Sequence, residues 1–229
     1  MGLALAIALS AMQEAAAQPM TVLPVTIQMA PGQKSATLTV ISEGQTSFQV
    51  RPYVWRQNEQ GDIQLADTDE LLASPPLGTI AAGGSQVIRL VLRRLPIDRE
   101  ATYRILVDQI PPPAAPGVVQ VALRLSIPIF AVPDTRVAPH VVWHIETSGG
   151  QTWLVAVNDG ISHLTVRDLA LRTAGGAAIP VETRNVSPYI LAGSTRRWRL
   201  SHAPPGGLLH LTGSGDRGAI DQQVGVNGR

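Results

Sequence analysis

The segment Val119–Ile129 carries the pattern that most constrains how this chain folds. It reads V-Q-V-A-L-R-L-S-I-P-I, with a branched aliphatic residue at every odd position and Gln, Ala, Arg, Ser or Pro at every even one. Successive side chains of a β-strand point to opposite faces, so this alternation predicts a strand with one apolar and one largely polar face. The segment is also longer than an ordinary strand of about five or six residues. It is therefore either the central strand of a sandwich or an edge strand that pairs with another chain.

The composition favours folded domains and excludes several functional classes. A length of 229 residues permits one large domain or two of about 100 residues each, and 45% hydrophobic with 15% charged residues argues against disorder. The net charge of +1 gives no strong field toward nucleic acid or an anionic membrane, so neither is expected as a partner. The absence of cysteine excludes a thiol nucleophile, a disulfide framework and cysteine-based metal sites.

The N-terminus predicts export. An apolar run, Gly2–Ala11, is followed by Ala15 and Ala17 at the small-x-small spacing that signal peptidase accepts. The run is too short to cross a membrane as a stable helix, and no Lys or Arg precedes it. We expect residues 1–17 to be a removed secretory signal; a frayed helical leader is the alternative.

Alternation also dominates the rest of the first half. Strands are predicted at Leu23–Met29, Ala36–Val40, Thr46–Arg56, Ser85–Arg94 and Tyr103–Val107. Pro52 lies inside one of them, which predicts an edge position or a bulge because proline cannot donate to a ladder. With turn signals about every 8–12 residues, these strands predict a β-sandwich. The clearest helical signal is Asp67–Ala73, where about two turns are expected.

A second set of strands follows a short stiff hinge between Pro133 and Pro139. These strands are predicted at Val141–Ile145, Trp153–Val157, Val166–Leu171, Ala178–Glu182, Arg196–Leu200, Leu208–Thr212 and Ala219–Val226. The prediction is an all-β chain with two sandwich domains, residues 18–133 and 134–229.

No combination of residues in the sequence indicates an enzyme. The chain has no G-x-S-x-G elbow, P-loop or dinucleotide fingerprint, so neither a catalytic residue nor a cofactor is expected. His140 and His144 would share one face of a strand, which leaves a weak two-histidine metal site open beside the plainer interpretation of two partly exposed histidines. His163 has no acidic or histidine partner at ligand spacing. We expect no metal site.

Several segments, in their order and spacing, resemble the PapD-like periplasmic chaperones of the chaperone–usher pilus pathway. The residues that carry the resemblance are Leu23–Val25, Pro31-Gly32, Ala36–Val40, Ser74–Pro76, Gly84–Leu90, Tyr103–Pro111, Leu125–Phe130 with Pro133, Val157–Gly160, Tyr189–Gly193 and Trp198. Within the family they resemble the archaic, spore-coat-U-associated branch.

The resemblance implies two immunoglobulin-like domains in a boomerang and a periplasmic, non-enzymatic assembly chaperone. Such a chaperone lends a strand to a pilin-like subunit that lacks its last strand, and delivers it to an outer-membrane usher. Filling one subunit pocket with Val or Leu is worth roughly 1.5–3 kcal/mol. The implied donor residues are Val119, Val121, Leu123, Leu125 and Ile127. An exposed donor edge also makes a self-capping homodimer plausible.

The chain departs from the family where many members hold the subunit's C-terminal carboxylate with two basic residues. The matching positions here are Thr26 and Pro128, and Val132 replaces an expected interdomain arginine. A carboxylate still needs a cationic or backbone donor. Arg89 and Arg104 lie in the best-matching segments and are the substitute candidates; the alternative is that both are simply exposed strand arginines.

A different class of function also fits an exported two-domain β protein. A secreted immunoglobulin-like binding or adhesive module would use the alternating face of Val119–Ile129 as its own core. In that case Leu123→Arg would unfold the protein, whereas in a strand donor it would abolish subunit capture alone.

Overall fold

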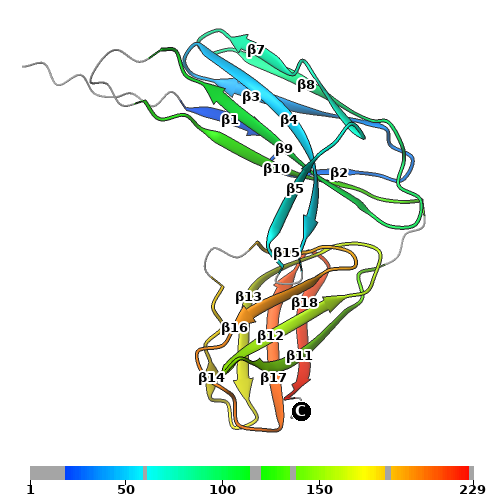
Figure 1. Ribbon diagram of the computed structural model, residues 1–229, viewed down its shortest axis with the longest axis vertical. Helices are drawn as coiled ribbons and strands as arrows, with labels where there is room; N and C mark the ends of the chain where they lie inside the picture. The colour runs from blue at the N-terminus through cyan, green and yellow to red at the C-terminus, as the bar shows by residue number, and fades with distance from the viewer. Residues whose placement is uncertain (1–18, 59–60, 114–119, 135–137, 184–186, 227–229) are drawn as a thin grey trace, which may run out of the picture.

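The computed structural model of the protein is all-β and consists of two β-sandwiches that meet at an angle (Figure 1). It describes residues 19–58, 61–113, 120–134, 138–183 and 187–226, so the predicted signal segment lies outside the described residues. Within this part of the chain, no helix is long and apolar enough to cross a membrane. The predicted domain boundary between residues 133 and 134 stays a prediction; it falls between the last strand of the first sandwich and the first strand of the second.

The N-terminal sandwich packs one sheet of four strands against one of six. The first sheet has the order β1 (Met20–Leu23), β3 (Ser35–Ser42), β8 (Ser85–Leu92), β6 (Leu71–Ser74). The second has the order β2 (Ile27–Met29), β10 (Arg124–Ala131), β9 (Ala101–Ile110), β4 (Thr46–Gln57), β5 (Ile63–Asp67), with β7 (Leu77–Ile80) also paired to β4.

The core of this sandwich is formed by the apolar side chains that occupy every second position of the strands and point inward. On β8 the side chains of Ile88 and Leu90 point inward and are fully buried, and on β9 that of Ile105 does the same from the opposite sheet. Each such side chain stabilises the domain by roughly 1.5–3 kcal/mol relative to an exposed one.

The predicted helix over Asp67–Ala73 is wrong. The structure has β5 and β6 there, joined by a turn in which the Thr68 hydroxyl accepts a hydrogen bond from the N–H of Glu70 (3.1 Å). Short polar side chains that bond to nearby backbone stabilise turns as readily as helix starts. Leu71 then pairs opposite Leu92 and is fully buried, so tertiary packing overrides the weak helical signal.

Pro52 occupies a gap in the pairing of an internal strand. It lies opposite Ile105 on β9, while the other side of β4 pairs with β7 as far as Gln49 and with β5 from Tyr53 onward. The missing N–H therefore faces a position where no neighbouring strand needs it. The prediction of an edge position is correct locally, although β4 as a whole is not an edge strand.

The C-terminal sandwich has a three-stranded and a five-stranded sheet. The first contains β11 (Val141–Ser148), β12 (Gln151–Asn158) and β16 (Thr195–Arg199). The second has the order β14 (Ala178–Ile179), β13 (Leu164–Thr173), β17 (Leu208–Gly215), β18 (Gly218–Gly225), with β15 (Tyr189–Ile190) also paired to β13. The predicted strands of this half are present, except that Ala178–Glu182 is reduced to β14 and an isolated bridge at Val181. β15 was not predicted because two residues show no periodicity.

Candidate functional site

The six-stranded sheet has an open edge along the first half of β10. One side of β10 pairs with β9 along the whole strand. On the other side β2 pairs only with the last three residues, Ile129–Ala131. Among the described residues, no strand pairs with Arg124–Pro128 on that side.

Backbone groups of this free half point outward at alternate residues. The N–H of Gln109 on β9 donates to the carbonyl of Leu123 (2.9 Å), so the odd-numbered residues of β10 face β9. Arg124 and Ser126 therefore direct both N–H and C=O toward the open side. An extended chain laid along this edge meets a ladder of donors and acceptors.

Exposure rises along the alternating aliphatic row. Ile127 is only 3% exposed and lies in the core of its own domain, whereas Leu123 and Leu125 are half-buried at the margin of that core. Val121 is 66% exposed, and Val119 lies outside the described residues. The implied donor row stays a prediction, and in this structure the side chain of Ile127 packs within its own domain. Val121, Leu123 and Leu125 are the described side chains that a partner can reach.

Two neighbours on β9 hold the start of this exposed row in place. The amide oxygen of Gln109 accepts from the backbone N–H of Leu123 (3.2 Å). The carboxylate of Asp108 accepts from Arg51 Nη2 (2.7 Å) and from Arg124 Nε (2.5 Å). Burial raises the pKa of Asp108, but the hydrogen bonds from Arg124 and Arg51 outweigh this effect and hold that pKa below its ordinary value. The carboxylate therefore stays charged and bridges β4, β9 and β10.

Arg104 on β9 lies where the two domains meet, close to one aromatic ring of each. Its guanidinium carbon sits 4.1 Å from the ring centroid of Trp55 on β4 and 6.0 Å from that of Tyr189 on β15. One terminal nitrogen donates to the hydroxyl of Ser126 on β10 (3.2 Å), while its Nε is buried without a partner among the described residues. Burial lowers the pKa of this guanidinium, and the negative charge that Tyr189 can carry opposes the effect. The geometry leaves an oriented, partly desolvated cation with unused donors beside the free edge.

Arg89 is not brought together with Arg104. It projects from the outer face of the four-stranded sheet, between the inward-facing Ile88 and Leu90, and lines a surface pocket with Thr26. Arg104 projects from the outer face of the other sheet, opposite Pro128 in the pairing. Because the two sheets of a sandwich pack about 10 Å apart, side chains on their outer faces cannot grip one carboxylate together.

Aromatic side chains join the two domains behind Arg104. Trp55, Phe130 and Tyr189 pack with ring centroids 5.3–5.8 Å apart, and Leu191 is buried with them. The side chain of Gln57 donates to the carbonyl of Tyr189 (2.9 Å) and accepts from the N–H of Leu191 (2.9 Å). No pattern in the sequence indicates that the partners of Trp55 come from the other domain.

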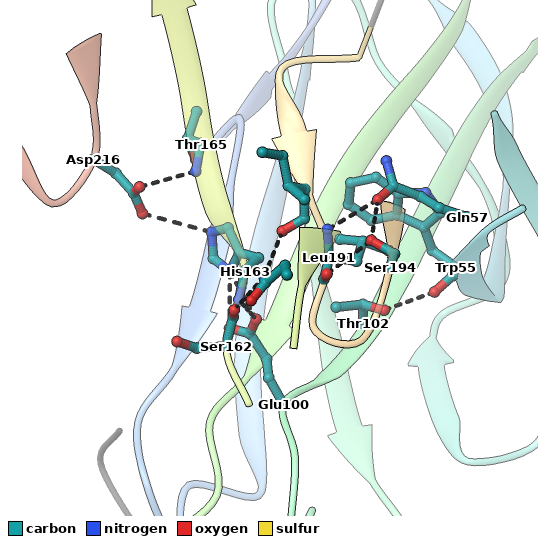
Figure 2. A network of polar contacts seen from close by, with 12 residues as sticks. Trp55, Gln57, Glu100, Thr102, Ser162, His163, Thr165, Leu191, Ser194 and Asp216 are labelled. Carbon is teal, nitrogen blue, oxygen red and sulfur yellow. Dashed lines mark hydrogen bonds and ion pairs between the residues drawn. The ribbon is translucent and has the colours of Figure 1, made fainter. Parts of the chain in front are cut away.

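The buried imidazole of His163 lies beside this aromatic cluster (Figure 2). Its Nδ1 lies 2.7 Å from Glu100 Oε2, and the N–H of His163 donates to the same oxygen (2.7 Å). Its Nε2 lies 3.7 Å from Asp216 Oδ2. Spacing along the sequence could not reveal this cluster, since Glu100 precedes His163 by 63 residues.

The structure does not join His140 and His144 to a metal site. His140 pairs with Asp159, and His144 lies half-buried on β11. No group of three or more His, Cys, Asp or Glu side chains suited to a metal ion occurs among the residues that the structure describes.

The sequence of residues 19–136 matches the profile of the pili and flagellar-assembly chaperone family, PapD N-terminal domain. No curated protein sequence matches the chain.

Solved structures of similar fold cover most of the chain. A chain of the CsuC–CsuE chaperone–tip adhesion subunit pre-assembly complex from archaic Csu pili of Acinetobacter baumannii aligns with a TM-score of 0.70 and 19% identity, covering 90% of this chain and 98% of that one. The E. coli chaperone DraB aligns with a TM-score of 0.59 and 22% identity, covering 91% and 98%. A chain of the Salmonella enterica SafA pilin–SafB chaperone complex aligns with a TM-score of 0.59 and 16% identity, covering 90% and 94%.

Proposed function

The chain belongs to the PapD-like family of pili and flagellar-assembly chaperones, and on that premise we propose that it captures pilin-like subunits in the periplasm by lending them the free edge of β10. The protein is a non-enzymatic chaperone, as the family is. The TM-score of 0.70 with a chain from archaic Csu pili supports placing it in the archaic branch.

The open edge of β10 is the observation that carries this proposal. A subunit that lacks its last strand exposes an apolar groove and unpaired backbone groups, and both favour aggregation. The outward N–H and C=O groups of Arg124 and Ser126 supply ladder partners for such a groove. Val121, Leu123 and Leu125 supply apolar side chains at alternate positions, each worth roughly 1.5–3 kcal/mol when fully buried.

Arg104 is the proposed contact for the subunit's C-terminal carboxylate. It lies beside the lent strand, and its partial burial strengthens an ion pair relative to one in open water. Arg89 is not part of this contact because it projects from the outer face of the four-stranded sheet, whereas Arg104 projects from the sheet that contains β10.

Release to an outer-membrane usher needs no nucleotide in this scheme. A subunit strand that fits the groove better than β10 replaces it, and the difference in packing drives the exchange. Before capture, a second copy of the chain can cover the same edge, since an unpaired edge strand is a template for pairing.

The decisive experiment is an affinity pull-down of the tagged protein from the periplasm of its native cell, with wild type beside Leu123→Arg. We expect a small β-rich protein to copurify near one-to-one with the wild type and to be lost with the variant. Val87→Arg is the matched control, because Val87 is an exposed aliphatic residue (51%) on the opposite sheet. It should retain the partner.

Circular dichroism of the purified variants separates the proposal from the binding-module alternative. A folded Leu123→Arg protein that still recovers the same subunit would overturn strand donation by β10. A Leu123→Arg protein that fails to fold would make the aliphatic row that leads into β10 part of an ordinary core.

A further inference from the structure

An imidazole is buried between two carboxylates at the contact of the two domains (Figure 2). The side chain of His163 is 5% exposed and that of Glu100 is 2% exposed. Glu100 lies just before β9 in the N-terminal domain, whereas His163 lies just before β13 in the C-terminal domain. Asp216, in the turn between β17 and β18, approaches the second ring nitrogen and is 29% exposed.

The arrangement fits a protonated ring better than a neutral one. A neutral imidazole donates through one nitrogen only, so with Nδ1 bonded to Glu100 its Nε2 lone pair would face the carboxylate of Asp216 at 3.7 Å. A protonated ring donates from both nitrogens and compensates the buried charge of Glu100, which would otherwise be strongly unfavourable. The carboxylate of Asp216 is itself held in this orientation by the N–H of Thr165 (2.9 Å).

The ring also touches the strand that carries the free edge. It stacks on Phe130 of β10 at a centroid distance of 3.6 Å and an interplanar angle of 14°, and meets the ring of Tyr189 at 5.9 Å. Tyr189 in turn contacts the guanidinium of Arg104. His163 of the C-terminal domain therefore contacts the buried end of β10 directly and is linked through Tyr189 to the guanidinium of Arg104.

We propose that His163 is a pH-responsive positioning residue. Its protonated ring holds the C-terminal domain against Glu100 and Phe130 of the N-terminal domain, and loss of the proton widens the range of angles between the two domains. This inference concerns the free protein and holds whether or not β10 captures subunits. Imidazoles are the side chains whose charge ordinarily changes between about pH 5 and 8. The periplasm is the proposed compartment, so external acidity would act directly on the contact between His163 and Glu100.

The groups that face the ring set the direction of the effect. They are Glu100 and Asp216 at its nitrogens, with Phe130 and Tyr189 at its faces. Both charged groups are acidic, so the contact is strongest while the ring is cationic and the carboxylates are anionic. It weakens when the ring loses its proton, and it weakens when the carboxylates take up protons.

The absence of cysteine makes a distance measurement direct. Spin labels on Lys34→Cys and Gln151→Cys, one exposed position in each domain, report the spread of interdomain distances in the full-length protein. For the wild type we expect a distribution about twofold wider at about pH 8.5 than at about pH 5.5. His163→Gln, which cannot carry the charge, should be equally wide at both. His210→Gln is the matched control, since His210 forms an exposed pair with Asp221 (2.7 Å) within one domain.

A wild-type distribution that does not change over this range, or a His163→Gln protein that keeps the wild-type response, overturns the proposal. If His163→Gln does not fold, Glu100→Gln replaces it, because that change removes the buried anion and keeps the size of the side chain. Protection of the His163 amide from hydrogen exchange is a second readout, since that N–H donates to Glu100. Its protection factor should fall about tenfold from acidic to alkaline pH in the wild type and stay constant in Glu100→Gln; a constant factor in the wild type contradicts the proposal.

Discussion

The two halves of β10 share one sequence pattern and have opposite environments. Toward its C-terminal end, Ile129 is fully buried, and β2 pairs with the strand at that point. Toward its N-terminal end, Leu125 is half-buried and no described strand covers the edge. The aliphatic row that precedes β10 continues to Val121, which is mostly exposed.

This difference separates stability from binding within a single strand. The buried half is held by β9, β2 and the opposing sheet, so its side chains contribute to the folding of the domain. The other half is held by β9 alone, so its apolar surface and outward backbone groups remain for a partner. A strand that is anchored at one end and open at the other suits temporary lending, because the anchor survives when the partner leaves.

The largest effect should come from truncating one side chain in the buried half of β10 and, for comparison, one in the exposed row that precedes its open half. Ile129→Ala should lower the free energy of unfolding by about 2–5 kcal/mol through lost burial and a cavity. Val121→Ala should leave stability unchanged and weaken subunit capture about tenfold, because roughly two buried methyl groups are lost from the complex. Urea unfolding and binding titrations measure the two quantities. Equal stability losses at both positions would mean that the two halves do not differ.

A smaller effect on subunit capture is expected when the two candidate arginines are replaced one at a time. Arg104→Ala should weaken capture by about 10–100-fold, since an ion-paired hydrogen bond is worth about 1.5–3 kcal/mol. Arg89→Ala should leave capture unchanged because that side chain projects from the other sheet of the sandwich. The comparison is made with the subunit recovered in the pull-down, with its C-terminal carboxylate free and amidated. Wild-type affinity that is the same for both forms of the subunit would remove Arg104 from the proposal.

The smallest effect should follow from removing the ion pairs of Asp108 at the start of the open half of β10. Asp108→Asn removes the charge that holds Arg51 and Arg124, so hydrogen exchange at Leu123–Leu125 should quicken and capture should weaken a few-fold. Asp69→Asn is the control, because it breaks an exposed pair with Arg93 away from β10. Unchanged exchange in Asp108→Asn would show that β9 pairing alone orders the strand.

The pH dependence of this contact has a definite sign. The pKa of Asp108 lies below its ordinary value in the folded protein, so the contact is fully present above the unfolded value of about 3.9. It is lost only as pH falls through the lower folded value. Exchange at Leu123–Leu125 should therefore be unaffected by this group between about pH 5 and 8, unlike the response proposed for His163.

Much of the fold could be predicted from period-two alternation, and little of the interdomain contact could. The strands of both sandwiches follow from patterns such as Ile88 and Leu90 on one face of β8, because each strand buries one face. The turn at Thr68–Glu70 was mistaken for a helix start, since the same polar side chains serve both structures. Arg104 was found as a candidate, but its neighbours Trp55 and Tyr189 were not.

The sequence by itself determined which side chains of β10 share a face, because alternation is a local property of an extended backbone. Only the tertiary structure decided where along that row burial ends, because burial at Ile127 depends on packing in a core built from both sheets. The same holds for His163, whose partner Glu100 is remote in the chain and is brought to it by the docking of two domains. Local pattern specifies a strand, and long-range packing specifies which part of its edge is left unpaired.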